Sequence, residues 1–91
     1  MISIAIPTAL RKYAGDQAQV QVAGATVGEA LQNLVAAHPT LRNHLMDESG
    51  KLRSFVNLYL GEEDVRNLQR EATALKSGDE LLIIPAIAGG R

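Results

Sequence analysis

The stretch LLIIPAIAGGR, residues 81–91, decides how the chain is interpreted, because it changes from an apolar strand into a tail with few side chains. Residues 81–84 form an unbroken aliphatic run of β-formers, which predicts a strand covered on both faces. Pro85 has no amide hydrogen, so we expect it to end that strand. We therefore divide the sequence into a folded domain, residues 1–85, and a flexible C-terminal tail, residues 86–91, which ends Gly-Gly-Arg.

The tail contains Ala86, Ile87, Ala88, Gly89 and Gly90 before an arginine. Fully extended, these five residues reach roughly 17 Å at about 3.3–3.6 Å per residue, which is enough to thread through a channel in a partner. Glycine has no Cβ, so the backbone at the tip fits a narrow slot. Chain ends fray whatever their function. The combination of an apolar strand, a proline and two glycines nevertheless favours a terminus that is presented to a partner.

Size and composition limit the possible functions. The chain has 91 residues, which corresponds to one small domain, and no cysteine, so packing alone must hold the fold. Nine basic and ten acidic side chains give a formal net charge of −1, and the aromatic residues are two tyrosines and one phenylalanine. Both features argue against nucleic-acid binding. We see neither a leader sequence nor an apolar run of about 18 residues, so we expect a cytoplasmic protein with no membrane partner.

Alternating apolar residues predict two strands near the start of the chain. The first covers residues 1–7 and the second covers 19–23, after a loop with turn residues at 11–17. The two strands are expected to pair as a β-hairpin.

The main helix is marked by a capping box, in which Thr26 and Glu29 satisfy free amides at a helix start. Apolar residues then recur at spacings of three and four, which predicts one buried helix face. This stripe comprises Val27, Ala30, Leu31, Leu34 and Val35. The helix should end at His38, because the residue before Pro39 is pushed out of the helical region.

The second half of the chain is predicted to contain one strong strand, at residues 53–60, among shorter elements. A short helix is expected at 40–46, a short edge strand at 65–68 and a single helical turn at 72–76. One main helix laid across one face of a mixed sheet of four to five strands gives an α+β fold, and the other sheet face stays at least partly open.

That open face is the expected partner interface. In the strand at 53–60, Phe55 and Tyr59 fall on the side opposite the core, and aromatic residues are favoured anchors in protein interfaces. Pro85 belongs to the same expected interface. The alternative is that the two aromatic side chains pack under a neighbouring loop.

Side chains that could carry catalysis are sparse. His38 and His44 do not have the spacing of a metal-ligand pair, so we predict no metal site. The acidic run 62–64 could hold a cation but is more typical of a solvated turn. The serines lie in no hydrolase elbow, and the glycines form no phosphate-binding loop. We therefore interpret the protein as a co-substrate of other enzymes and not as an enzyme.

Several short segments, in this order along the chain, match the pattern of a known family. They are Ile6-Pro7-Thr8 with Leu10-Arg11, Leu45-Met46-Asp47, Phe55-Val56-Asn57 with Tyr59, Glu63-Asp64-Val65-Arg66, Gly78-Asp79-Glu80, Ile84-Pro85-Ala86 and Ala88-Gly89-Gly90. Through them the sequence resembles the ubiquitin-like sulfur carriers of the MoaD and ThiS family over nearly its whole length, and most closely the CysO type. The resemblance implies a β-grasp fold, in which the first and last strands lie parallel at the sheet centre.

The resemblance also implies a function. An adenylating sulfurtransferase would use ATP to convert the Gly90 carboxylate into an acyl adenylate, which a sulfur donor would turn into a thiocarboxylate. In CysO-type systems a PLP-dependent cysteine synthase accepts the sulfur, and a metalloprotease then releases cysteine. In MoaD-type systems the sulfur goes to a molybdopterin precursor, and in ThiS-type systems it goes to the thiazole of thiamine. The alternative is therefore that this chain is the small subunit of molybdopterin synthase, with the large subunit as its partner, or a thiamine sulfur carrier. ATP, PLP and zinc would be bound by these partners, and this chain would bind no cofactor. We expect cysteine biosynthesis in preference to the other pathways.

Arg91 departs from the family pattern, in which the second glycine is terminal. We expect a peptidase to remove Arg91 before activation, and an expression artefact is the alternative. Two other functions stay open. A ubiquitin-like modifier would join Gly90 to lysines through isopeptide bonds, and a non-reactive binding module would use Phe55 and Tyr59 without the tail.

Overall fold

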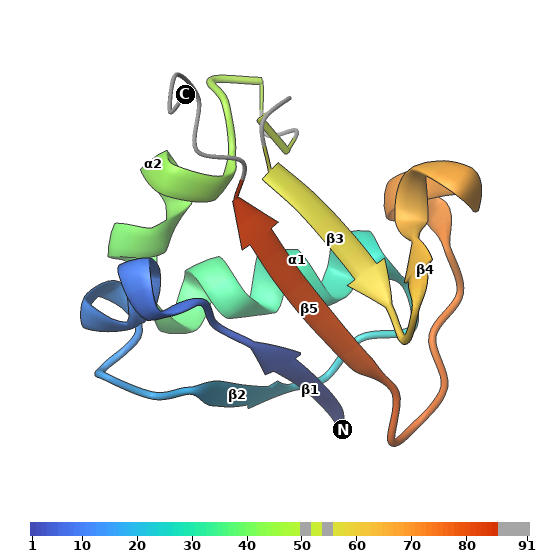
Figure 1. The fold of residues 1–91 in the computed structure, drawn as a ribbon, viewed down its shortest axis with the longest axis horizontal. Coiled ribbons are helices and arrows are strands. Elements are labelled where there is room, and N and C mark those ends of the chain that lie inside the picture. The colour runs from blue at the N-terminus through green and yellow to red at the C-terminus, as the bar shows by residue number, and fades with distance from the viewer. Residues whose placement is uncertain (50–51, 54–55, 86–91) are drawn as a thin grey trace.

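The computed structural model describes residues 1–49, 52–53 and 56–85. Within these residues five strands form one mixed sheet in the order β2-β1-β5-β3-β4, and helix α1, Val27–Ala37, crosses one face of it (Figure 1). The strands are β1 Ile2–Ala5, β2 Gln19–Val22, β3 Val56–Leu60, β4 Glu63–Asp64 and β5 Glu80–Pro85.

The first and last strands form the centre of the sheet. β1 and β5 run parallel, with Ile4 opposite Leu81 and Ala5 opposite Leu82, while β2 and β3 pair antiparallel on the outer sides. The predicted hairpin of the first two strands is therefore confirmed, as is the parallel central pair expected of a β-grasp fold. β5 pairs with β1 over residues 80–82 and with β3 over residues 81–85, so the end of the strand that leads into the tail is paired with β3 alone.

Helix α1 begins and ends where the capping pattern predicts. The amide of Glu29 donates to Thr26 Oγ1 at 3.2 Å, and the Glu29 carboxylate accepts from the amide of Ala25 at 2.9 Å. His38 is the C-cap and Pro39 follows it. The predicted short helix at 40–46 is present as a 3-10 turn, η2 Pro39–Leu41, that continues into α2 Arg42–Leu45.

The hydrophobic core lies between α1 and the face of the sheet that α1 covers. All five residues of the predicted helix stripe are buried there. The sheet contributes alternate residues of its strands, which are Ile2, Ile4, Val20, Val22, Val56, Leu58, Leu81 and Ile83.

Two short elements were predicted at the wrong positions. The edge strand expected at 65–68 is a 3-10 turn, η3 Val65–Asn67, and the true edge strand β4 starts at Glu63. Gly61 is the reason, because its φ of +64° makes a turn tight enough for Leu60 to pair at once with Glu63. Val65 then turns into the core, where it is 3% exposed.

The helical turn expected at 72–76 is also wrong. The turn is η4, Arg70–Ala72, and the chain becomes extended at Thr73. Residues 73–75 run beside the start of α1 instead, where the amide of Val27 donates to the Thr73 carbonyl and the amide of Leu75 donates to the Ala25 carbonyl. The loop predicted at 11–17 likewise contains a 3-10 helix, η1 Thr8–Tyr13, before its turn.

Candidate functional site

The open face of the sheet is where the last strand departs from its predicted burial. Leu81 and Ile83 are 0% and 1% exposed, as expected, but Leu82 and Ile84 are 41% and 39% exposed. The prediction that this strand is covered on both faces is therefore wrong. The helices lie on one face, so alternate residues of the strand face the core and the solvent.

Two residues of β3 lie beside this exposed pair. In the register of the two strands Tyr59 is opposite Leu82 and Asn57 is opposite Ile84, and both β3 side chains are half-buried. Tyr59 thus lies on the open face, as predicted. Pro85 pairs with Val56 at the end of the ladder. Phe55, the other aromatic residue expected in the interface, lies outside the described residues.

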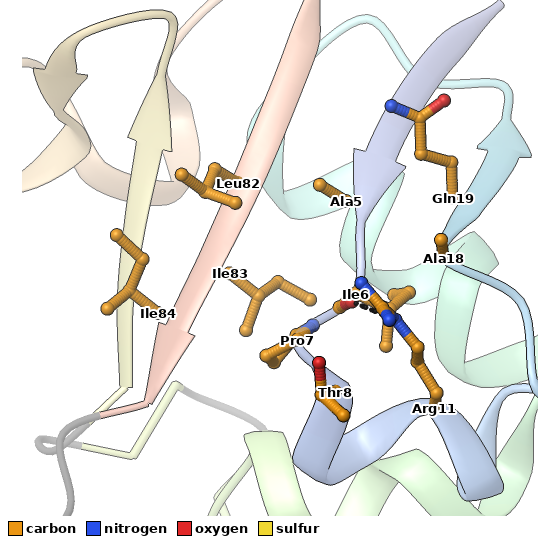
Figure 2. Close-up of a pocket in the computed structure, with 10 residues that line it drawn as sticks. All are labelled: Ala5, Ile6, Pro7, Thr8, Arg11, Ala18, Gln19, Leu82, Ile83 and Ile84. Atoms are coloured by element: carbon orange, nitrogen blue, oxygen red, sulfur yellow. Dashed lines mark hydrogen bonds between the residues drawn. The ribbon is translucent and has the colours of Figure 1, made fainter.

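A hollow of about 640 Å³ opens beside β5, and we call it the β5 hollow (Figure 2). It forms because the pairing of β1 with β5 ends at Ala5 and Leu82, after which the chain turns away through Pro7 into η1. Proline has no amide hydrogen, so it cannot continue the ladder toward the end of β5. The hollow is lined by Ala5, Ile6, Pro7, Thr8, Arg11, Ala18, Gln19, Leu82, Ile83 and Ile84.

Arg11 is the ionisable residue that lines the β5 hollow. Its Nε donates to the carbonyl oxygen of Ile6 at 3.0 Å, and the side chain is half-buried (Figure 2). This contact fixes the base of the guanidinium against the end of β1. Sequence reasoning missed the hollow, and the only signal for it was Pro7, which stops the first strand while the last strand continues.

The residues considered for catalysis or metal binding do not form a site in the described part of the chain. His44 stacks on the ring of Tyr13, with centroids 4.0 Å apart and planes at 25°. Over residues 1–49, 52–53 and 56–85 there is no group of three or more His, Cys, Asp or Glu side chains arranged to hold a metal ion. Of the acidic run, Glu62 lies in the turn as expected, whereas Glu63 and Asp64 form β4.

The tail residues lie beyond the end of the described chain. The predicted threading segment Ala86, Ile87, Ala88, Gly89 and Gly90, together with Arg91, is outside the described residues. What the structure does place is the strand that carries them, since Pro85 ends β5 directly after exposed Ile84. Among the described helices, none is both long and apolar enough to cross a bilayer.

Comparison with known proteins gives one consistent family. Residues 4–90 match the ThiS family. The sulfur carrier protein CysO of Mycobacterium tuberculosis is 43% identical over 91 residues, which cover 98% of this chain and 98% of that protein. Small archaeal modifier protein 1 of Haloferax volcanii is 40% identical over 83 residues, covering 89% of this chain and 91% of that protein.

A solved structure shows the same fold. A chain in the crystal structure of the Amycolatopsis orientalis BexX/CysO complex is 38% identical and superimposes with a TM-score of 0.89, covering 99% of this chain and 100% of that chain. The resemblance noted in the sequence is thereby confirmed. The chain belongs to the ThiS family and is a CysO-like protein with the β-grasp fold of ubiquitin-like carriers and modifiers.

Proposed function

We propose that this protein is a sulfur carrier whose Gly90 carboxylate, freed by removal of Arg91, is converted to a thiocarboxylate. The observation that carries the proposal is the extent of the family match, which runs from residue 4 through both glycines to residue 90. The similarity to CysO over nearly the whole chain favours cysteine biosynthesis as the pathway. ATP-dependent activation is consistent with the expected cytoplasmic location.

The chemistry needs activation because a carboxylate is a poor electrophile. A Gly90 carboxylate oxygen attacks the α-phosphorus of ATP on the partner, pyrophosphate leaves, and an acyl adenylate forms. A hydrosulfide ion then attacks the acyl carbon, AMP leaves with the bonding electron pair, and loss of the sulfur-bound proton leaves a thiocarboxylate on Gly90. While Arg91 is attached, Gly90 is locked in an amide and cannot take part. Glycines at the tip suit this chemistry because they add no side chain near the reacting carbon.

The open sheet face supports a docking role in the same function. Leu82 and Ile84 expose aliphatic surface beside Tyr59, directly before the strand leads into residues 86–90. Pro85, one of the expected interface residues, follows Ile84 in the chain and pairs with Val56, whereas Phe55 lies outside the described residues. The A. orientalis CysO was crystallised in a complex with BexX, so a protein of this type has a folded partner. We infer that the present chain binds an adenylating enzyme, a sulfur-accepting cysteine synthase and a processing metalloprotease in turn.

The test compares three forms of the protein, one ending at Gly90, one retaining Arg91 and one ending at Gly89. Each is incubated with the adenylating partner, ATP and sulfide, and its intact mass is measured. We expect only the form ending at Gly90 to gain the mass of one oxygen replaced by sulfur. A sulfur-loaded product that still carries Arg91 would contradict the proposed processing step.

A ubiquitin-like modifier is the second candidate, and the 40% identity to small archaeal modifier protein 1 favours it. The same activated carboxylate would then form isopeptide bonds with lysine side chains. The mass experiment separates the two functions when a cell extract is added. A modifier forms higher-mass conjugates that persist after treatment with a thiol, whereas a carrier forms no such conjugates.

A further inference from the structure

The β5 hollow combines apolar walls with a single fixed cation. Leu82, Ile83 and Ile84 line it on the β5 side, and the Ile83 side chain points toward Pro7 (Figure 2). The Leu82 and Ile84 side chains lie on the β3 side of the strand, where their exposure extends the apolar surface beyond the hollow. Exposed apolar surface of this kind on a small domain marks an interaction site.

Arg11 gives the hollow its chemical preference. The guanidinium has five N–H donors, and within the described residues only the one on Nε donates a hydrogen bond, to the Ile6 carbonyl. Across the residues that the structure describes, Arg11 pairs with no carboxylate. A half-buried cation that is held by a neutral carbonyl still lacks a counter-ion, and a carboxylate that binds both terminal nitrogens is the geometry that arginine favours.

The position of the hollow links it to the tail. Residue 86 is two positions beyond Ile84, so the chain between them spans at most about 7 Å. A partner that receives residues 86–90 must therefore lie against this end of β5, beside the hollow. This step rests on the proposed function, in which an adenylating enzyme takes the tail.

We propose that the β5 hollow docks a segment of the adenylating partner in which a large apolar side chain stands next to an aspartate or glutamate. The apolar side chain packs against Pro7 and the β5 residues that line the hollow, and the carboxylate binds the free edge of Arg11. Arg11 is then a specificity determinant, because an enzyme with a basic or neutral residue at that point leaves the arginine desolvated and unpaired.

The main test measures the Kd between the adenylating partner and the form of the carrier that ends at Gly90. We expect Arg11→Glu to raise Kd at least about tenfold, since it replaces a charge-assisted contact with a repulsion. Lys12→Glu is the matched control, because it makes the same charge change one residue later at an exposed position outside the hollow. Raising the salt concentration should reduce the difference in Kd between the Arg11→Glu and Lys12→Glu variants, because salt screens the charge repulsion.

Arg11→Glu removes the hydrogen bond to Ile6 and could disturb the fold, so a second pair of variants tests the hollow without changing Arg11. Gln19 lines the hollow and is exposed, so Gln19→Glu adds a negative charge there without changing size. Gln21→Glu makes the same change on the same strand outside the hollow. We expect Gln19→Glu to weaken binding several-fold and Gln21→Glu to leave it near the wild-type value.

The outcomes separate this inference from the proposed function. If the unmodified carrier ending at Gly90 forms no thiocarboxylate, the proposed function fails. If it does form one, and Arg11→Glu and Gln19→Glu bind no more weakly than their controls, the hollow is not the docking site and the inference is overturned. It is also overturned if Arg11→Glu instead abolishes self-association of the carrier in sedimentation experiments, because the occupant is then a second copy.

Discussion

The two sides of β5 carry the same kind of residue but differ in burial. On one side Leu81 and Ile83 are completely buried under α1, and on the other Leu82 and Ile84 keep about two-fifths of their surface exposed. Both sides are aliphatic, so hydrophobicity alone does not distinguish the stabilising face from the face that we propose binds a partner. Among the described residues, what distinguishes the two faces is that helix α1 covers one of them (Figure 1).

This comparison separates stability from recognition within a single strand. Changes on the covered face should alter the free energy of unfolding, whereas changes on the open face should alter partner affinity and leave folding nearly unchanged. The following substitutions test that separation, beginning with the largest expected effect on stability.

Leu81→Ala should destabilise the domain by about 2–5 kcal/mol, because it leaves a cavity in a fully buried site between the sheet and α1. The neighbouring Leu82→Ala removes the same atoms from the open face and should cost about 1 kcal/mol or less. Urea denaturation monitored by circular dichroism gives both values. Equal losses in the two variants would show that the open face also supports the fold.

Gly24→Ala should cost about 1–3 kcal/mol through overpacking, because a Cβ there would lie 2.7 Å from the amide nitrogen of Ala30 and 2.9 Å from its Cα. The close approach brings the connection between β2 and α1 directly against the helix at Ala30. Gly28→Ala is the control, since its Cβ would meet the Glu71 carbonyl at 3.2 Å while alanine favours the helix. A thermal shift for Gly24→Ala no larger than for Gly28→Ala would argue against the tight packing.

Thr26→Ala should cost about 1 kcal/mol, because the amide of Glu29 loses its acceptor at the start of α1. Thr26→Ser keeps the hydroxyl and should retain most of the stability. Chemical denaturation of the two variants measures the contribution of the cap to the covering layer. If serine and alanine destabilise equally, the hydrogen bond contributes nothing and the methyl group of threonine matters instead.

The double variant Leu82→Thr/Ile84→Thr should have the smallest effect on stability and a large effect on binding. Threonine keeps β-propensity, and both positions face away from the core, so we expect a loss of about 1 kcal/mol or less. Partner affinity should fall, since the aliphatic surface beside Tyr59 is removed. Gel-shift or calorimetric titration with the adenylating partner is the measurement, and wild-type affinity would locate the interface elsewhere.

Sequence patterns predicted the long elements well and the short ones poorly. The strand at the start, the α1 boundaries and the buried stripe of the helix follow from periodicity, the Thr26 cap and Pro39, which act over a few residues. The segments 65–68 and 72–76 were misassigned because their conformation depends on distant contacts. Val65 enters the core after the Gly61 turn, and residues 73–75 bond to the start of α1.

The candidate site was predicted in part. The open sheet face and the place of Tyr59 on it were expected from alternation along β3, and the role of Gly90 stays a prediction that the mass experiment tests. Exposure of Leu82 and Ile84 was not predicted, because an unbroken aliphatic run is typical of a strand buried on both sides. The β5 hollow could not be predicted, since it joins residues from the two ends of the chain.

The sequence by itself determined where the main strands and helix lie. It also indicated that residues 81–90 are a strand followed by a tail with few side chains. Those features depend on neighbouring residues, through side-chain period, capping and the missing amide of proline. Only the tertiary structure decided that α1 covers one face of β5 and that Pro7 and Arg11 line the same hollow as residues 82–84. Burial and enclosure depend on which distant segments pack together, and no local pattern along the chain encodes that choice.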